Sequence, residues 1–209
     1  NIADNPRLRL AIDRAKADNM PKDTIEKAIK KGTGELAGES YEEILYEGYA
    51  HGGVAVMCKV VTDNRNRTAG EIKKIFERAG ASLGQPNCVA FQFSPKGVIV
   101  VPREAAGEER MMEIALEAGA DDVQTSAEIY EVTCASERFH EVKQSLESAG
   151  VTLQSADLLM VAENNISLDL QTARKVRRLI EALDDHDDVE AVYSNSDISD
   201  EVMVELAKE

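Results

Sequence analysis

Three amphipathic helix patterns in this sequence end in the same Ala-Gly pair, and each is followed by residues that favour strands. The pairs are Ala79-Gly80, Ala118-Gly119 and Ala149-Gly150. Glycine adopts the left-handed conformation that ends a helix at little steric cost, which gives the recurrence a physical cause without a duplication. Helices that alternate in this way with short strands predict a mixed architecture in which helices pack on sheets.

Residues 97–162 show the most complete pattern. The order is a strand at Val98–Val101, a helix, strands around Val123–Cys134, a second helix, and a strand near Leu158–Val161. The apolar residues of both helices recur at the helical spacing of three and four. This βαββαβ order predicts a ferredoxin-like domain.

The segments on either side of this domain are each incomplete. Residues 41–93 predict two strands, a helix that begins at a Thr68/Glu71 capping box, and a strand at Cys88–Phe93. The last part of the chain predicts a helix and then a strand at Val189–Tyr193, with no partners of their own. Together the two segments would complete one sheet covered by helices, so we predict a domain inserted into a discontinuous domain.

The first thirty-four residues predict two short helices. Asn5-Pro6 and the pair Asn19 and Pro21 are typical of helix starts, and residues 34–40 are typical of a linker. The expected fold class is therefore α+β with three domains, of which two are α/β sandwiches. The predicted boundaries are 1–34 for the remainder of an N-terminal helical domain, 35–96 with 163–209 for the discontinuous domain, and 97–162 for the inserted ferredoxin-like domain.

The charge of −15 is unevenly distributed. Residues 1–34 carry eight Lys and Arg against five Asp and Glu, whereas residues 35–209 carry sixteen against thirty-four. Electrostatic binding to the phosphate backbone of nucleic acid normally requires a basic domain. Any phosphate contact is therefore expected from the N-terminal end or from a local basic patch.

Composition excludes two broad classes. The chain has 43% hydrophobic residues, which argues against wholesale disorder, and no stretch approaches the roughly 20 apolar residues of a membrane-spanning helix. The sequence shows no signal peptide, and its three scattered cysteines predict reduced, buried thiols in a cytoplasmic protein. Because the sequence opens at Asn1 without methionine, we expect further residues before it in the natural protein.

The search for catalytic motifs favours a non-enzymatic protein. Hydrolase, zinc-protease and P-loop signatures are absent, and no cofactor is predicted. Asp184–Asp188 is the one cluster whose side chains suit a metal, and it underlies the remote alternative of a metal-dependent enzyme. Adjacent residues rarely converge on one ion, so a solvated acidic turn is favoured and no metal site is predicted.

The most unusual segment is Asp63–Thr68, which links a strand to a helix N-terminus. Backbone N–H groups, the positive end of the helix dipole and two arginines would share one edge there, and each of these features favours phosphate. The alternative is a turn in which Asn66 or Thr68 caps the helix and the arginines form ordinary ion pairs. The candidate nucleic-acid-binding residues are Arg65, Arg67, Asn64, Asn66, Lys22, Lys27, Lys30 and Lys31.

A second basic cluster lies on the last long predicted helix. Arg174, Lys175, Arg177 and Arg178 fall opposite its apolar face. In so acidic a chain, a solvated helix face is the favoured interpretation of this cluster.

Several ordered motifs together resemble the YebC/PmpR family along the whole chain. The motifs are NPRLR (5–9), NMPKDTIEKAIKKGTG (19–34), YEGYAHGG (46–53), DNRNRT (63–68), EAGADDV (117–123) and DDVEAVYSN (187–195). The resemblance implies three domains, with one α/β domain inserted in the other, and a basic Gly-His-Ser-Lys-Trp start that would precede Asn1. Ala50-His51 departs from the Gly-Pro common in the family, so no function is assigned to that turn.

The resemblance also implies a role in gene expression. Bacterial members carry the label of probable DNA-binding transcriptional regulators, whereas mitochondrial members resemble translational activators and bacterial members have been linked to stalled ribosomes. We therefore expect a non-enzymatic nucleic-acid-binding regulator, with promoter DNA or ribosomal RNA as the partner. The sequence alone shows no helix-turn-helix or other DNA-reading signature and leaves the choice open.

Overall fold

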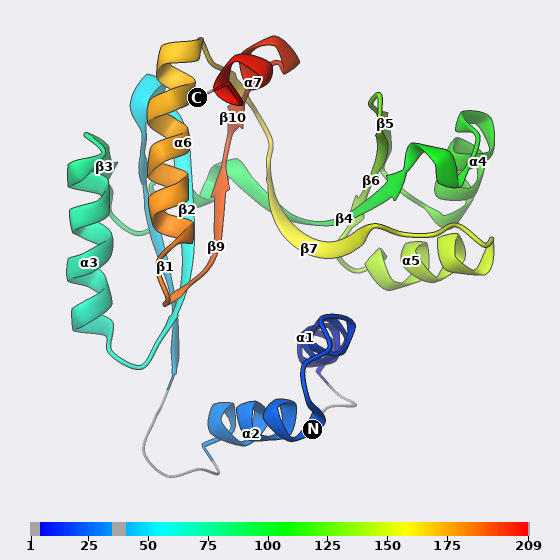
Figure 1. Ribbon diagram of the computed structural model, residues 1–209, viewed down its shortest axis with the longest axis horizontal. Helices are drawn as coiled ribbons and strands as arrows, with labels where there is room; N and C mark the ends of the chain where they lie inside the picture. The colour runs from blue at the N-terminus through cyan, green and yellow to red at the C-terminus, as the bar shows by residue number, and fades with distance from the viewer. Residues whose placement is uncertain (1–4, 35–40, 209) are drawn as a thin grey trace.

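The computed structural model describes residues 5–34 and 41–208, which form three parts (Figure 1). The first part is a pair of helices, α1 (Pro6–Ala17) and α2 (Lys22–Gly32). Asn5 caps α1, because its side chain accepts a hydrogen bond of 3.0 Å from the backbone N–H of Leu8. The two predicted N-terminal helices are thus present, and nearly all of the predicted linker lies outside the described residues.

The second part contains a four-stranded sheet in the order β3-β1-β2-β9. Because it is the first sheet along the chain, we call it the first sheet. Its strands are β1 (Glu42–Tyr49), β2 (Ala55–Thr62), β3 (Ser82–Leu83) and β9 (Val189–Ser194), and each hydrogen-bonded pair is antiparallel. Two helices, α3 (Arg65–Arg78) and α6 (Leu170–Asp184), cover one face of this sheet (Figure 1). The short parallel pair β8 (Ile166–Ser167) and β10 (Ser196–Asp197) and the helix α7 (Asp200–Leu206) complete this part.

The helix layer is attached to this sheet by apolar burial. Val56, Cys58 and Val60 of β2 alternate along the strand and pack with Ile72 and Phe76 of α3, all fully buried. The buried face of α6 joins the same core through Ala173, Val176, Leu179 and Leu183. Burying a large aliphatic or aromatic side chain contributes about 1.5–3 kcal/mol, so this core holds together segments more than a hundred residues apart in sequence.

The third part is the predicted ferredoxin-like unit. Its strands β4 (Phe93–Pro102), β5 (Asp122–Thr125), β6 (Ile129–Ala135) and β7 (Ser155–Ala162) form an antiparallel sheet in the order β5-β6-β4-β7. The helices α4 (Glu108–Ala118) and α5 (Phe139–Ser148) pack against its core residues. The chain enters this sheet after the first three strands of the second part and leaves it before α6 and β9.

The expected α+β fold class is therefore confirmed, and the order of elements, with β4 to β7 between β3 and α6, agrees with the predicted insertion of the ferredoxin-like unit. The predicted helix ends are also present, with positive φ angles of 66°, 86° and 79° at Gly80, Gly119 and Gly150. The numerical domain boundaries stay predictions. Of the three cysteines, Cys58 and Cys134 are buried as expected, whereas Cys88 is partly exposed.

The predicted strand at Cys88–Phe93 is wrong in its first five residues, because a buried carboxylate holds this segment in turns. Glu47 on β1 is 4% exposed, and its two oxygens accept hydrogen bonds of 2.7, 2.8 and 2.7 Å from the backbone N–H groups of Asn87, Val89 and Ala90. A short 3-10 turn (Ala90–Gln92) follows, and β4 starts only at Phe93. The carboxylate thus replaces the ladder partners that a strand would need.

Replacing Glu47 with Gln is expected to lower the free energy of unfolding by about 2–3 kcal/mol, because an amide cannot accept all three N–H bonds in the buried site. Urea denaturation monitored by circular dichroism measures the loss. Glu43→Gln is the matched control on the same strand, since the side chain of Glu43 is 53% exposed and its pair with Lys59 is a long one of 3.7 Å. Equal losses for the two variants would contradict the anchoring role of Glu47.

Candidate nucleic-acid interface

The sharp connection between β2 and α3 positions the predicted Asp63–Thr68 segment. Asn64 is the N-cap of α3, and its side chain accepts a hydrogen bond of 3.1 Å from the backbone N–H of Arg67. The predicted Thr68/Glu71 capping box is wrong, and so is a cap at Asn66. The N-cap is Asn64, four residues before Thr68, and Thr68 is fully buried inside the first turns of the helix.

Asp188, the residue before β9, joins the C-terminal end of β2 to the first turns of α3. Its Oδ2 accepts a hydrogen bond of 2.8 Å from the guanidinium of Arg67 and lies 3.0 Å from the hydroxyl of Thr62 and 2.5 Å from that of Thr68. Arg67 also pairs with Asp63 at 3.1 Å. We call Asp188, Arg67, Thr62 and Thr68 the Asp188 network.

The network keeps Asp188 ionised. Burial raises the pKa of this carboxyl, but hydrogen bonds from Thr68, Arg67 and Thr62 outweigh burial, so that the pKa lies below its ordinary value. The side chain of Asp188 is 16% exposed and that of Arg67 is 44% exposed. The guanidinium therefore neutralises a largely buried charge and still has one side toward solvent.

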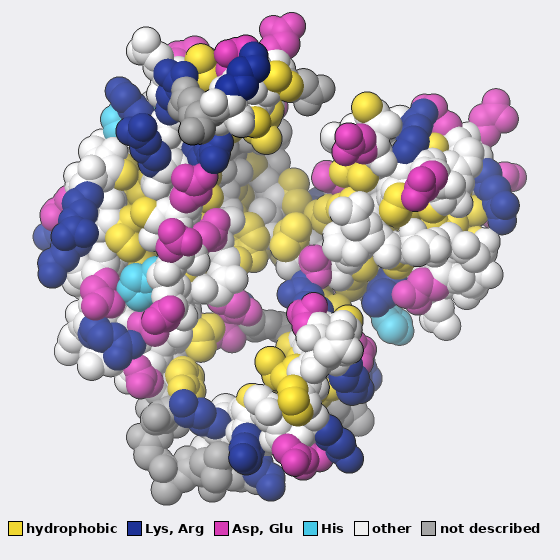
Figure 2. All heavy atoms as spheres, viewed as in Figure 1, with side chains coloured by type: hydrophobic (Ala, Val, Ile, Leu, Met, Phe, Trp, Pro, Cys, Tyr) yellow, Lys and Arg dark blue, Asp and Glu magenta, His cyan; other side chains and the backbone are white. Residues whose placement is uncertain are grey.

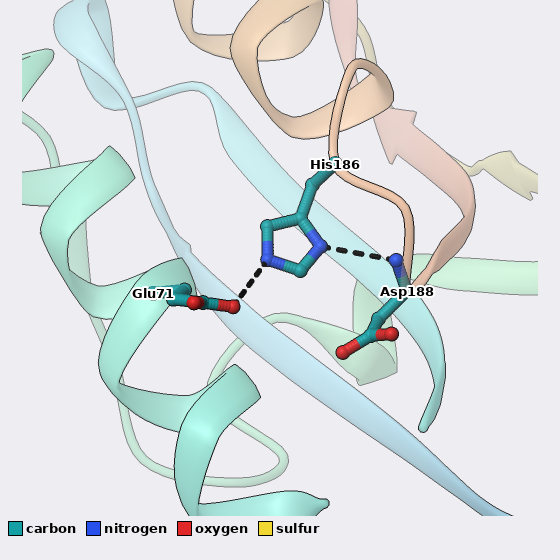
Figure 3. Close-up of side chains that lie close together, drawn as sticks. All are labelled: Glu71, His186 and Asp188. Carbon is teal, nitrogen blue, oxygen red and sulfur yellow. Dashed lines mark hydrogen bonds and ion pairs between the residues drawn. The ribbon is translucent and has the colours of Figure 1, made fainter. Parts of the chain in front are cut away.

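His186 adds a second contact with α3, through Glu71 (Figure 3). Its Nε2 lies 3.0 Å from Oε2 of Glu71, and its Nδ1 accepts a hydrogen bond of 3.1 Å from the backbone N–H of Asp188. The proton of the neutral ring therefore lies on Nε2, where it is donated to Glu71.

These contacts favour an ion-pair network over a metal site. The ligand atoms of Glu71, His186 and Asp188 lie within 4.8 Å of one another, so the predicted cluster at Asp184–Asp188 contributes two of its five residues to a real convergence. Both nitrogens of His186 already have partners, and Arg67 supplies the positive charge that a cation would provide. The absence of a metal site stays a prediction.

Arg65 differs from Arg67 in being open to solvent. Its side chain is 69% exposed, and its ion pair is a long one of 3.9 Å to Glu42 on β1. The first turn of α3 contains no acidic residue, so no carboxylate of that turn offsets the charge of Arg65 at the positive end of the helix dipole. Asn66 is exposed in the same turn. Arg65 and the start of α3 thus offer an anion a positive and accessible surface.

One contact brings the lysines of α2 to the same end of the molecule. Lys31 lies over the ring of Tyr41, 5.3 Å from its centroid, and Tyr41 directly precedes the β1 residue that pairs with Thr62 in the sheet. Lys27 and Lys30 are exposed on α2. Figure 2 shows dark-blue side chains both over α2 and over the start of α3.

The predicted site residues therefore separate into two groups. The structure places Lys30, Lys31 and Arg65 at one end of the first sheet, whereas Lys22 is at the other end of α2, about 13 Å away along the helix axis, and pairs with Glu26 at 3.7 Å. Asn64 is used as a cap and Arg67 as an ion-pair partner. Sequence reasoning missed Asp188 and Thr62, since no local pattern signals a contact over 120 residues.

Asp188→Asn is expected to lower the free energy of unfolding by about 2 kcal/mol at neutral pH, because it removes a hydrogen-bonded charge pair. The pKa of Asp188 is lower in the folded state, so its stabilisation is present above the unfolded value of about 4 and is lost as the pH falls through the folded value. The difference between wild type and variant should therefore shrink toward pH 2. Urea denaturation from pH 7 to pH 2 tests this, with the neighbouring exposed Asp187→Asn as control; a difference that does not change with pH would contradict it.

Within the described ranges, no helix has both the length and the hydropathy that a bilayer span requires. Two family models match the chain: the N-terminal domain of TACO1/YebC proteins over residues 1–35, and the second and third domains of TACO1/YebC over residues 41–196.

Curated relatives and a solved structure agree with this match. A probable transcriptional regulatory protein of Geobacter sulfurreducens is 50% identical over 97% of this chain and 81% of its own length. One of Rubrobacter xylanophilus is 52% identical over 97% of this chain and 82% of its own length. The crystal structure of a conserved hypothetical protein from Aquifex aeolicus is similar with a TM-score of 0.86 and 46% identity, over 96% of this chain and 83% of that one. The chain belongs to the TACO1/YebC family.

Proposed function

We propose that this protein is a non-enzymatic regulator of gene expression that binds nucleic acid, and that it acts at the level of transcription. The names of its relatives support regulation of transcription. The observation that carries the binding surface is the position of Lys30, Lys31 and Arg65, which come from separate elements and lie at one end of the first sheet.

Each side chain has a distinct role in this surface. Arg65, Lys27, Lys30 and Lys31 contact phosphate oxygens, because all four side chains are exposed and Arg65 lies at the N-terminus of α3. Arg67 is a positioning residue: its contacts with Asp188 and Asp63 hold the first turn of α3 in place. Asn64 acts in the same way through its cap.

The acidic body of the protein limits how a nucleic acid approaches. With a net charge of −15, most of the surface repels phosphate, so contact is restricted to local basic areas. Restricted contact of this kind would also suit docking on the RNA of a ribosome, which is the alternative function. The experiment must therefore present both targets.

Lys30→Glu combined with Arg65→Glu is expected to raise the dissociation constant for a fluorescein-labelled 30-base-pair duplex DNA by about tenfold or more, because two phosphate contacts are replaced by repulsion. Fluorescence polarisation at 100 mM salt measures the change. Glu substitution of Lys22, at the far end of α2, is the control and should have little effect. Sedimentation with purified bacterial ribosomes is measured in parallel.

Three outcomes are informative. Duplex binding that the double variant weakens supports the proposal. Sedimentation with ribosomes, combined with no measurable duplex binding, would replace transcription with translation as the level of action. Binding that is identical in the wild type and the double variant would overturn the assigned surface.

A further inference from the structure

Positive charge in this protein is concentrated in the two helices that cover the first sheet. Together α3 and α6 hold nine of the 24 Lys and Arg residues of the chain but only four of its 39 Asp and Glu residues. Their net charge is +5, whereas the whole chain has a net charge of −15. The acidic composition of the chain therefore does not extend to this helix layer.

The two helices run antiparallel, which brings particular ends together. Two contacts join the loop after α6 to the first turns of α3: the hydrogen bond between His186 and Glu71 and the ion pair between Asp188 and Arg67. At the opposite end, His51 lies beside Gly80, just after α3, and the adjacent Gly52 lies beside Thr172 near the start of α6. The last turn of α3 is therefore close to the first half of α6.

The basic side chains gather at this second end. Lys74 and Arg78 are exposed near the end of α3, and Lys175 and Arg178 are exposed within the first nine residues of α6, with Arg174 beside them. Each pair recurs at the spacing of three or four residues that aligns side chains along one face of a helix. Figure 2 shows dark-blue side chains over both helices at this end. We call Lys74, Arg78, Arg174, Lys175 and Arg178 the α3–α6 basic patch.

Ion pairing within the protein leaves most of this charge available. Lys73 pairs with Glu77 at 3.7 Å and Arg177 with Glu181 at 2.6 Å, so two of the four carboxylates of α3 and α6 are already used. Besides the hydrogen bonds from Thr172, the charge of Lys175 also helps to lower the pKa of Asp169, the cap of α6. In the part of the chain that the structure describes, Lys74, Arg78, Lys175 and Arg178 form no ion pair. The sequence favoured a solvated helix face on α6, and the structure adds exposed basic residues of α3 beside that face.

We propose that the α3–α6 basic patch binds the phosphate backbone of double-stranded nucleic acid as a second contact surface. This inference rests on the proposed function, whose surface lies at the opposite end of α3. Fourteen residues of α3 extend over about 20 Å, the axial length of about six phosphates in one strand of a duplex. One strand that follows the helix layer therefore reaches both surfaces.

Lys175→Glu with Arg178→Glu tests the patch against a matched control, Arg110→Glu with Lys143→Glu on the inserted domain, which changes the net charge equally. Polarisation of the labelled 30-base-pair duplex is measured between 50 and 200 mM salt. The patch variant should bind about tenfold more weakly at 100 mM salt, and the slope of log K against log salt should fall by about 2 in magnitude, because two phosphate contacts are lost. The control should retain the wild-type slope.

Circular dichroism and the urea midpoint establish that each variant is folded, and the neutral pair Lys175→Ala and Arg178→Ala should lose a similar part of the slope. A wild-type slope in both patch variants would overturn the inference while the proposed function stands, provided that Lys30→Glu with Arg65→Glu still weakens binding. No binding of the duplex by the wild type would overturn the proposed function as well.

Discussion

The Asp188 network is the interaction on which the helix layer of this protein depends. One carboxylate accepts hydrogen bonds from the end of β2 and from the first turns of α3, and it stands at the start of the β9 segment, 126 residues after its partner Thr62. Asp188 thereby joins the two sequence segments of the discontinuous domain, and it does so at the N-terminal end of α3, where Arg65 is exposed. Because a largely buried charge is costly without its partners, the network favours a single arrangement of these three elements.

Much of the fold could be predicted from local patterns, and the exceptions have a common physical origin. Helical spacing and the glycine stops locate the helices, and two incomplete segments around a complete βαββαβ unit indicate the insertion. The strand at Cys88–Phe93 was mispredicted because Glu47, about forty residues earlier, accepts the N–H groups of that segment. Local residue preferences carry no information about such distant partners.

Distant partners also explain why the sequence predicts only part of the candidate site. The Asp63–Thr68 segment does place arginines at a helix N-terminus, but Arg65 is the more accessible of the two, because the guanidinium of Arg67 is paired with Asp188 and Asp63. The acidic turn at Asp184–Asp188 supplies one of those partners, Asp188. The basic cluster of α6 gains significance only when α3 is placed beside it, a relation that the sequence does not show.

The central claim is that a nucleic acid contacts basic side chains on α2, α3 and α6 while the acidic remainder of the surface stays exposed. Lysine acetylation footprinting by mass spectrometry, with and without duplex DNA, tests it most directly. The account predicts that Lys27, Lys30, Lys74 and Lys175 become protected, whereas Lys143 and Lys208 on other elements keep their reactivity. Protection of Lys143 and Lys208 with none at the other four lysines would contradict it.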